Sequence, residues 1–347
     1  MKPTWLCRAL LTLAIGALPG VGHPQAATPE NAWAWLERMA QATSDLHYEG
    51  TFVYLCGAQV ETLRIVREGG PDDERQRLFS LSGPAREVVV EAHQDASWTV
   101  PNRQTAWAED PYRYFPLLAV IPRERGRLES HYELQLLEED RVAGRAVRVI
   151  AIKPRDTWRF GYRLWLDQQT GMALRTVLLD EKGRPIEQMF FTELQIKPHL
   201  IGKLPGLSKS SVFSLLHAPV EGIGTDQKEK VNVGPSAAGE PVVQSAWRVG
   251  AIPAGFTKVS QQRFTEALGR HPTEHWVFAD GLATISVFLE KLEGDPPLLQ
   301  GSSQWGSMNA FGLVLEGHQV LVVGEAPAAT VQHIAMSIRH SSETSPP

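Results

Sequence analysis

The sequence predicts an α+β protein with two antiparallel-sheet domains, of which the first is the larger. Alternating apolar and polar runs follow one another from residue 47 to residue 197, joined by links of hairpin length. Such strands pair antiparallel, because a parallel crossover needs a dozen or more residues. A second set of strand-like runs begins at residue 247, after a stretch rich in Gly, Pro and charge. The 347 residues are also too many for one ordinary core.

The N-terminus has the pattern of a secretory signal. Lys2 and Arg8 are followed by the apolar run 9–22 and then by the small residues PQAA. The run is shorter than the roughly 20 residues that span a bilayer. We therefore expect residues 1–26 to be a signal peptide, with cleavage near Ala26 or Ala27, and the protein to be exported.

Net charge and cysteine content argue against nucleic-acid binding and against an internal disulfide. Loss of Lys2 and Arg8 leaves 32 of the 34 basic residues against 39 acidic ones, a net charge of −7. Nucleic-acid binding needs a concentrated basic face, so we expect no nucleic-acid partner. Cys56 is then the single cysteine, which excludes an internal disulfide. It is interpreted as a small buried residue in a strand, with pairing between two chains in a homodimer as the alternative.

The first domain is expected to cover residues 28–217. It opens with a helix over 31–46, in which Asn31 can cap the start and Trp35, Met39 and Ala42 form one stripe. The region 110–134 breaks the strand pattern and is interpreted as loops and a short helix over one face of the sheet. The predicted strands and hairpins are 47–55, 60–68, 74–82, 85–92, 97–101, 132–155 with a turn near 142–144, 162–180 with a turn at 167–171, and 185–197.

A linker and a smaller α+β domain complete the chain. Gly, Pro and charged residues predict a linker over 218–245, and the second domain is expected at 246–340. Its predicted strands lie in 247–264, 274–292 and 319–327. A closing helix is predicted over 327–340, with Pro327 near its first turn, where proline is tolerated.

The sequence offers little catalytic chemistry. The histidines are scattered, and no metal-binding, phosphate-cradling or nucleophile motif occurs, so we expect no enzyme activity, no metal and no cofactor. Asp167, Asp180 and Asp280 each lie beside a glycine-containing turn, and turn chemistry explains all three. An extracytoplasmic hydrolase therefore lacks a nucleophile and base.

Aromatic side chains suggest an apolar binding face on the first sheet. Tyr48, Phe52 and Tyr54 share one parity of their strand, while Glu49 and Thr51 share the other. These rings either fill an ordinary core or line a cavity for an acyl chain or apolar peptide, with 110–134 as its lid. The candidates for the lipid cavity are Phe52, Tyr54, Phe79, Trp98, Tyr112, Phe115 and Leu164.

Several longer stretches resemble the MucB/RseB family. FVYLCGAQVETLRIVREGGPDDERQRLFSLSGPAREVVV (52–90) is similar to its N-terminal domain, and the similarity continues through WLDQQTGMALRTVLLDEKGRPIEQMFF. It resumes with IPAGF (252–256), FADGLATISVFLE (278–290), GSMNAFG (306–312) and VVGEAP (322–327). The resemblance covers nearly the whole exported chain in the same order.

The resemblance implies a periplasmic negative regulator of an envelope-stress sigma factor. The first domain would be an unclosed antiparallel β-barrel crossed by helices, like the lipoprotein carriers. The protein would bind the periplasmic domain of a membrane-spanning anti-sigma factor, shield it from the first protease, and be released by a lipid or lipopolysaccharide-like amphiphile. The alternative is a periplasmic lipid or lipoprotein carrier. Candidates for contact with the partner are Arg64, Arg86, Glu87, Trp247, Phe256 and Phe278.

Overall fold

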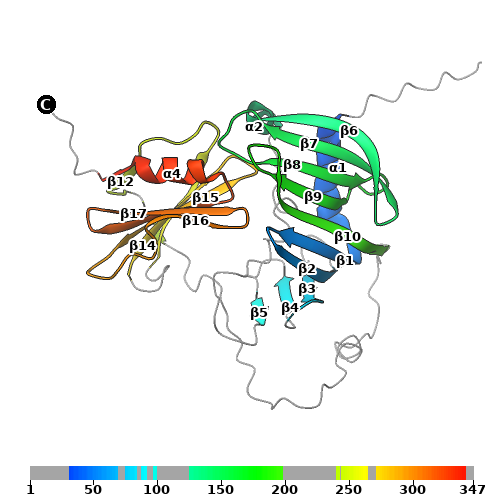
Figure 1. Cartoon of the computed structure of the whole chain (residues 1–347), viewed down its shortest axis with the longest axis horizontal. Helices are drawn as coiled ribbons and strands as arrows, with labels where there is room; N and C mark the ends of the chain where they lie inside the picture. Colours follow the sequence, from blue (N-terminus) through cyan, green and yellow to red (C-terminus); the bar gives the residue numbers. More distant parts are fainter. Residues whose placement is uncertain are drawn as a thin grey trace, which may run out of the picture. The chain divides into compact units, whose positions relative to one another are not determined.

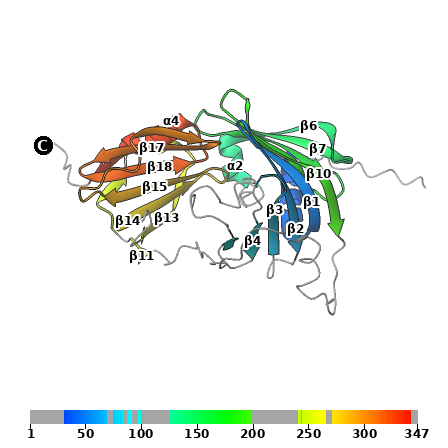
Figure 2. The same ribbon diagram turned by 60° about the horizontal axis from the view of Figure 1, so that its bottom comes forward.

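The computed structural model describes residues 31–68, 75–83, 87–91, 97–99, 125–197, 240–242, 244–264 and 271–340. They form an antiparallel sheet of ten strands, a second of seven, and a separate pair of strands (Figures 1 and 2). The predicted signal peptide and nearly all of the predicted linker lie outside these residues. Within the described part of the chain, the helices are too short or too polar to cross a membrane.

The chain begins its described part with helix α1 (Ala32–Asp45), as predicted. The Asn31 side chain caps it by accepting a hydrogen bond of 2.8 Å from the Ala34 amide. The predicted stripe of Trp35, Met39 and Ala42 is buried. Figure 1 shows α1 crossing behind β8 and β9, so the helix covers one face of the first sheet.

The first sheet is an open meander in two halves. β1 pairs with both β2 and β10, which joins the halves, and β5 and β6 stand at opposite ends of the strand order. The sheet is therefore unclosed, as expected. Short helix α2 (Arg125–His131) precedes β6. The strands are β1 (His47–Cys56), β2 (Gln59–Glu68), β3 (Arg75–Ser80), β4 (Glu87–Glu91), β5 (Ser97–Thr99), β6 (Tyr132–Val142), β7 (Arg145–Pro154), β8 (Gly161–Asp167), β9 (Ala173–Leu179) and β10 (Pro185–Lys197).

The second sheet has the order β11-β13-β14-β15-β18-β17-β16. Helix α4 (Ala328–Ser337) packs on it, and the buried Val331 and Ile334 join its core. Pro327 occupies the N-cap position of α4 and makes no capping hydrogen bond with its side chain. The strands are β11 (Glu240–Pro241), β13 (Thr257–Phe264), β14 (Thr273–Ala279), β15 (Thr284–Lys291), β16 (Gly301–Trp305), β17 (Met308–Leu315) and β18 (His318–Gly324); β12 (Trp247–Val249) pairs with β19 (Ile338–His340).

Three expectations for this sheet were wrong in detail. The segment 247–264 is two strands in different sheets, because Pro253 lacks an amide donor and Gly255 has a φ of +93°. Strands β16 and β17 were not predicted at all. The predicted helix over 327–340 ends at Ser337, and the last three residues pair with β12 instead.

Candidate functional site

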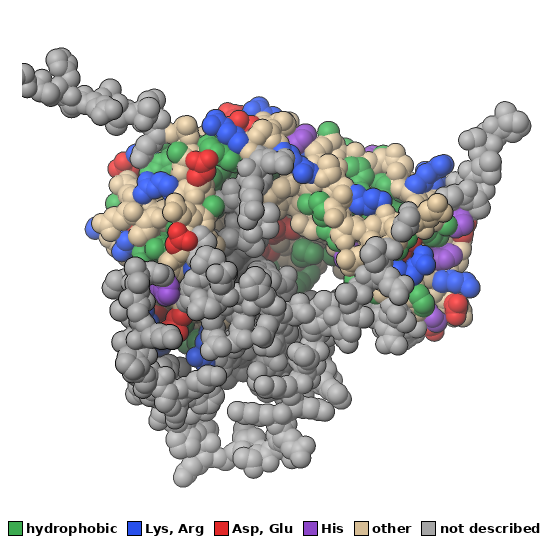
Figure 3. Space-filling model, turned by 180° about the vertical axis from the view of Figure 1, so that it is seen from behind, with side chains coloured by type: hydrophobic (Ala, Val, Ile, Leu, Met, Phe, Trp, Pro, Cys, Tyr) green, Lys and Arg blue, Asp and Glu red, His purple; other side chains and the backbone are tan. Residues whose placement is uncertain are grey.

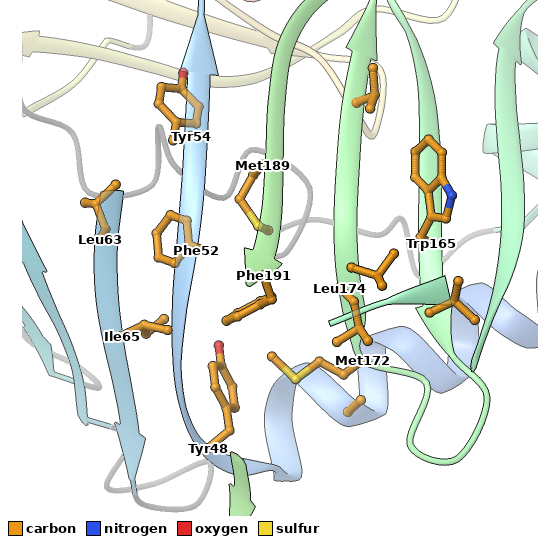
Figure 4. Packing of buried hydrophobic residues seen from close by; sticks show 14 of the residues in the cluster. Tyr48, Phe52, Tyr54, Leu63, Ile65, Trp165, Met172, Leu174, Met189 and Phe191 are labelled. Atoms are coloured by element: carbon orange, nitrogen blue, oxygen red, sulfur yellow. The ribbon is translucent and has the colours of Figure 1, made fainter. Parts of the chain in front are cut away.

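One face of the first sheet carries a continuous apolar cluster. Phe52 lies opposite Phe191 on one side and Leu63 on the other, and all three are buried. The Phe52 and Phe191 rings have centroids 5.8 Å apart, and Tyr48 meets Phe191 edge-on at 6.2 Å (Figure 4). Because residues of one parity face one side of a strand, these rings and Tyr54 form one surface.

A glycine on β1 lets the Phe191 ring pack closely against this strand. A Cβ at Gly50 would come within 2.8 Å of the Phe191 ring and 2.7 Å of the Glu193 carbonyl oxygen. Both distances are too short for any side chain, so the close packing of Phe191 requires glycine at position 50.

The predicted cavity residues divide into three groups. The first group is buried: Phe52 and Tyr54 belong to the cluster of Phe191, whereas Leu164 belongs to a separate cluster that includes residues of α1. Phe79 lies on the opposite face, paired with Arg64 and next to the guanidinium of Arg77. Its neighbour Leu78 occupies the buried position instead, so Phe79 does not share the apolar face of Phe52. The backbone of Trp98, in β5, pairs with Val88 of β4. The Trp98 side chain, Tyr112 and Phe115 lie outside the described residues.

Three of the six predicted partner-binding residues are core residues. Trp247, Phe256 and Phe278 are 9% exposed or less and build the core of the second domain, so they offer no outer surface. Arg64 is partly exposed on β2 and forms an ion pair with Glu49. Glu87 begins β4 opposite Phe79, whereas its side chain and Arg86 lie outside the described residues.

A buried ion pair joins the two sheets. Arg159, in the loop before β8, donates from Nη1 to Oδ2 of Asp280 at 3.0 Å, and neither side chain is exposed. The hydroxyl of Tyr132 donates to the same oxygen at 2.8 Å. The Arg159 guanidinium also lies 5.1 Å from the Phe256 ring centre and donates to the Ala254 carbonyl. Burial and the charge of Asp280 raise the pKa of Tyr132 well above its usual range.

Asp280 also stabilises a turn, as the sequence predicted. Its Oδ1 accepts from the amides of Leu282 and Ala283 at 2.9 and 2.8 Å, which is the turn chemistry expected from the sequence. Its other oxygen holds Arg159 and Tyr132. The same carboxylate therefore fixes the β14–β15 turn and fastens it to the first domain.

A second polar contact between the sheets lies where β1 ends and β10 begins. Glu187 is buried on the same parity of β10 as Met189 and Phe191. Its Oε2 accepts from the Tyr54 hydroxyl at 2.8 Å, and its Oε1 accepts from the Ser307 amide at 2.8 Å. Ser307 lies in the β16–β17 turn, so this contact also ties the second sheet to the first.

These junction residues were not predicted, although one signal for them existed. Glu187 interrupts an apolar parity in IEQMFF, and a carboxylate at a core position needs a partner. The residues around Arg159 and Ser307 in the sequence do not indicate these contacts, because the partners lie 121 and 120 positions away.

The described surface carries both signs of charge. Figure 3 shows Lys, Arg, Asp and Glu side chains interspersed on the visible described face, with no large patch of one sign. Among the described residues, no group of three or more His, Cys, Asp or Glu side chains is placed to hold a metal ion.

Comparison with known proteins gives consistent matches along the chain. The MucB/RseB N-terminal domain matches residues 31–212, and the MucB/RseB C-terminal domain matches residues 241–339. The sigma factor AlgU regulatory protein MucB of Pseudomonas aeruginosa is 34% identical over 95% of this chain and 96% of its own. The sigma-E factor regulatory protein RseB of Escherichia coli K12 is 26% identical over 98% of both chains.

Solved structures agree with these sequence matches. MucB in complex with MucA(peri) has a TM-score of 0.63 and 30% identity, and the match covers 89% of this chain and 99% of that one. A crystal structure of MucB by itself has a TM-score of 0.57 at the same identity and covers 89% and 98%.

Proposed function

Because the chain belongs to the MucB/RseB family, we propose that it is a periplasmic regulatory protein that binds the periplasmic domain of a membrane anti-sigma factor. The likeness to MucB in complex with MucA(peri) carries this proposal, since it extends over 89% of the chain and both sheets. The site is a binding site without catalytic chemistry of its own.

The regulatory effect follows from occlusion. A partner segment held against this protein is shielded from the protease that makes the first cut, and its release exposes the cleavage site. An amphiphile such as lipopolysaccharide releases the partner only if it binds the partner-free state more tightly. A 100-fold loss of partner affinity needs a coupling free energy of about 2.7 kcal/mol, which is within the usual allosteric range.

The apolar face of the first sheet is the proposed amphiphile site. Phe52, Tyr54, Leu63 and Phe191 provide the apolar surface that an acyl chain requires, and they lie side by side on β1, β2 and β10. These side chains are buried, so an acyl chain enters by displacing them from one another. That rearrangement is how binding of the lipid would change the affinity for the anti-sigma segment.

A lipid or lipoprotein carrier is the competing function, and the second sheet argues against it. A carrier has no evident use for a second domain fastened by Arg159, Asp280 and a network of hydrogen bonds. Fastening of this kind suits a protein whose two domains act together on one partner.

The proposal is tested by calorimetric titration of the exported chain with the periplasmic segment of the anti-sigma factor from the same organism. We expect saturable binding that weakens at least tenfold when lipopolysaccharide is present. Lipid binding without any partner binding would contradict the regulatory function and favour the carrier.

A further inference from the structure

Two carboxylates from different sheets meet at the turn between β16 and β17. The Ser307 amide donates to Oε1 of Glu187 at 2.8 Å, while the Ser307 hydroxyl donates to Oε1 of Glu325 at 3.0 Å. Glu187 belongs to β10, and Glu325 directly follows β18. One residue thus bridges two acidic side chains.

The turn is seated closely against the end of β1. A Cβ at Gly306 would lie 2.4 Å from the Cys56 sulfur and 2.8 Å from Oε1 of Glu187, so a side chain there would displace these groups. The φ of +60° at this position also favours glycine. Cys56 is itself buried, and its thiol lies 3.6 Å from the same carboxylate oxygen. The turn therefore covers Cys56 whenever this contact is made.

No described cation offsets the two acids. The groups that contact them or interact with them are the Tyr54 hydroxyl and Cys56 thiol on β1, Ser307 in the turn, and Tyr162 on β8. All of these are neutral when protonated. Burial and the charge of Glu187 raise the pKa of Glu325 to about 7, although the Ser307 hydrogen bond acts in the opposite direction.

We propose that Glu325 holds a proton while the Gly306–Ser307 turn is seated against Glu187 and Cys56, so that this contact closes at mildly acidic pH and opens as the pH rises. Glu325 is half-buried while the turn is closed. Opening moves it away from the facing Glu187 and exposes it further, so that it releases its proton to solvent and ionises. The Arg159–Asp280 ion pair is a separate contact, so opening is local to the turn.

The direction of the pH effect follows from the raised pKa. Below the ordinary value of 4.5, Glu325 is protonated in both states and pH has no effect. Between 4.5 and about 7, the open state loses its proton first, so each rise in pH favours opening. Above about 7 the effect is complete, and the closed-to-open ratio has fallen on the order of 100-fold.

The reactivity of the Cys56 thiol measures how often the turn is open, because the closed turn covers this thiol. In the chain with Cys7→Ser, Cys56 is the one thiol. Its rate of reaction with an aromatic disulfide reagent is measured from about pH 5 to about pH 8. Each rate is divided by that of the same chain unfolded in urea, which removes the effect of thiolate ionisation. We expect the corrected rate to rise on the order of 100-fold.

Three variants distinguish the effect of the proton on Glu325 from the effect of packing at the Gly306–Ser307 turn. Glu325→Gln stays neutral and still accepts from Ser307, so its corrected rate should stay low and rise less than about threefold. Glu187→Gln removes the facing charge and should reduce the rise. Glu139→Gln, an exposed carboxylate on β6 that pairs with Arg148, is the charge control and should behave like the parent chain.

Two results would overturn the proposal. One is a corrected rate that does not change with pH in the parent chain. The other is a Glu325→Gln variant that either keeps the full rise or reacts rapidly at every pH, because the contact would then not depend on a proton at Glu325. The measurement uses no anti-sigma partner, so its outcome is independent of the proposed function.

Discussion

Arg159 and Asp280 form a 3.0 Å ion pair in which neither side chain reaches solvent, and this pair links the β14–β15 turn to the loop before β8. Arg159 is the cation that pairs with Asp280, and Arg159 itself also forms a 3.0 Å ion pair with the partly exposed Asp156. Pairing matters here because an unpaired ion in a dry environment is costly. The pair connects the two domains, although no motif in either sequence indicates that they are in contact here.

Asp280→Ala should lower the free energy of unfolding by about 2–3 kcal/mol, because Nη1 of the buried Arg159 loses its carboxylate partner while Asp156 still pairs with Nε. Urea denaturation followed by tryptophan fluorescence measures this loss. Asp180→Ala is the control, since Asp180 also caps a turn but pairs with the exposed Arg184. Equal losses in the two variants would show that only the turn chemistry matters.

Asp167 should make stability depend on pH in the acid range. Burial opposes its ionisation, but hydrogen bonds from Arg145 and Thr170 outweigh burial and lower the pKa of Asp167. The stabilisation is complete above the ordinary pKa of about 3.9 and disappears as the pH falls through the lowered folded-state value.

Asp167→Asn should therefore be less stable than the parent by about 2 kcal/mol at neutral pH. The difference should shrink below about pH 4, as acid protonates Asp167 in the parent. Urea denaturation at several pH values checks this. A difference that stays constant down to pH 2 would contradict the ionic role of Asp167.

Phe52→Leu should weaken the response to amphiphile, because it removes ring contacts from the apolar face at a stability cost below about 1.5 kcal/mol. The readout is the lipopolysaccharide concentration that releases half of the bound anti-sigma segment, which we expect to rise at least threefold. Val53→Ala is the matched control, since Val53 is the next residue of β1 and points to the other face. If both variants respond alike, the amphiphile site lies elsewhere.

The strands of the first sheet could be predicted because each one alternates clearly. Phe52 and Tyr54 were placed on the buried face by parity, and the structure confirms their burial. Phe79 was misplaced because Leu78 beside it is equally apolar, so alternation leaves two choices. The pairing of Leu78 with Ile65 decides between them, and pairing is a tertiary property.

The junction between the sheets could not be predicted, for a physical reason. The sequence predicts a turn at Asp280, and one carboxylate oxygen does serve that turn. The other oxygen binds Arg159, which lies 121 positions away, and only the folded arrangement brings them together. Strand β16 was missed because GSSQW has the composition of a loop, and its strand geometry comes from pairing with β17.

Protease protection tests the central claim most directly. The exported chain is mixed with the periplasmic segment of the anti-sigma factor and its first-cut protease, with and without lipopolysaccharide. We predict that the chain slows cleavage at least tenfold and that lipopolysaccharide restores the rate. Cleavage at an unchanged rate, with the chain present in saturating amount, would contradict the account.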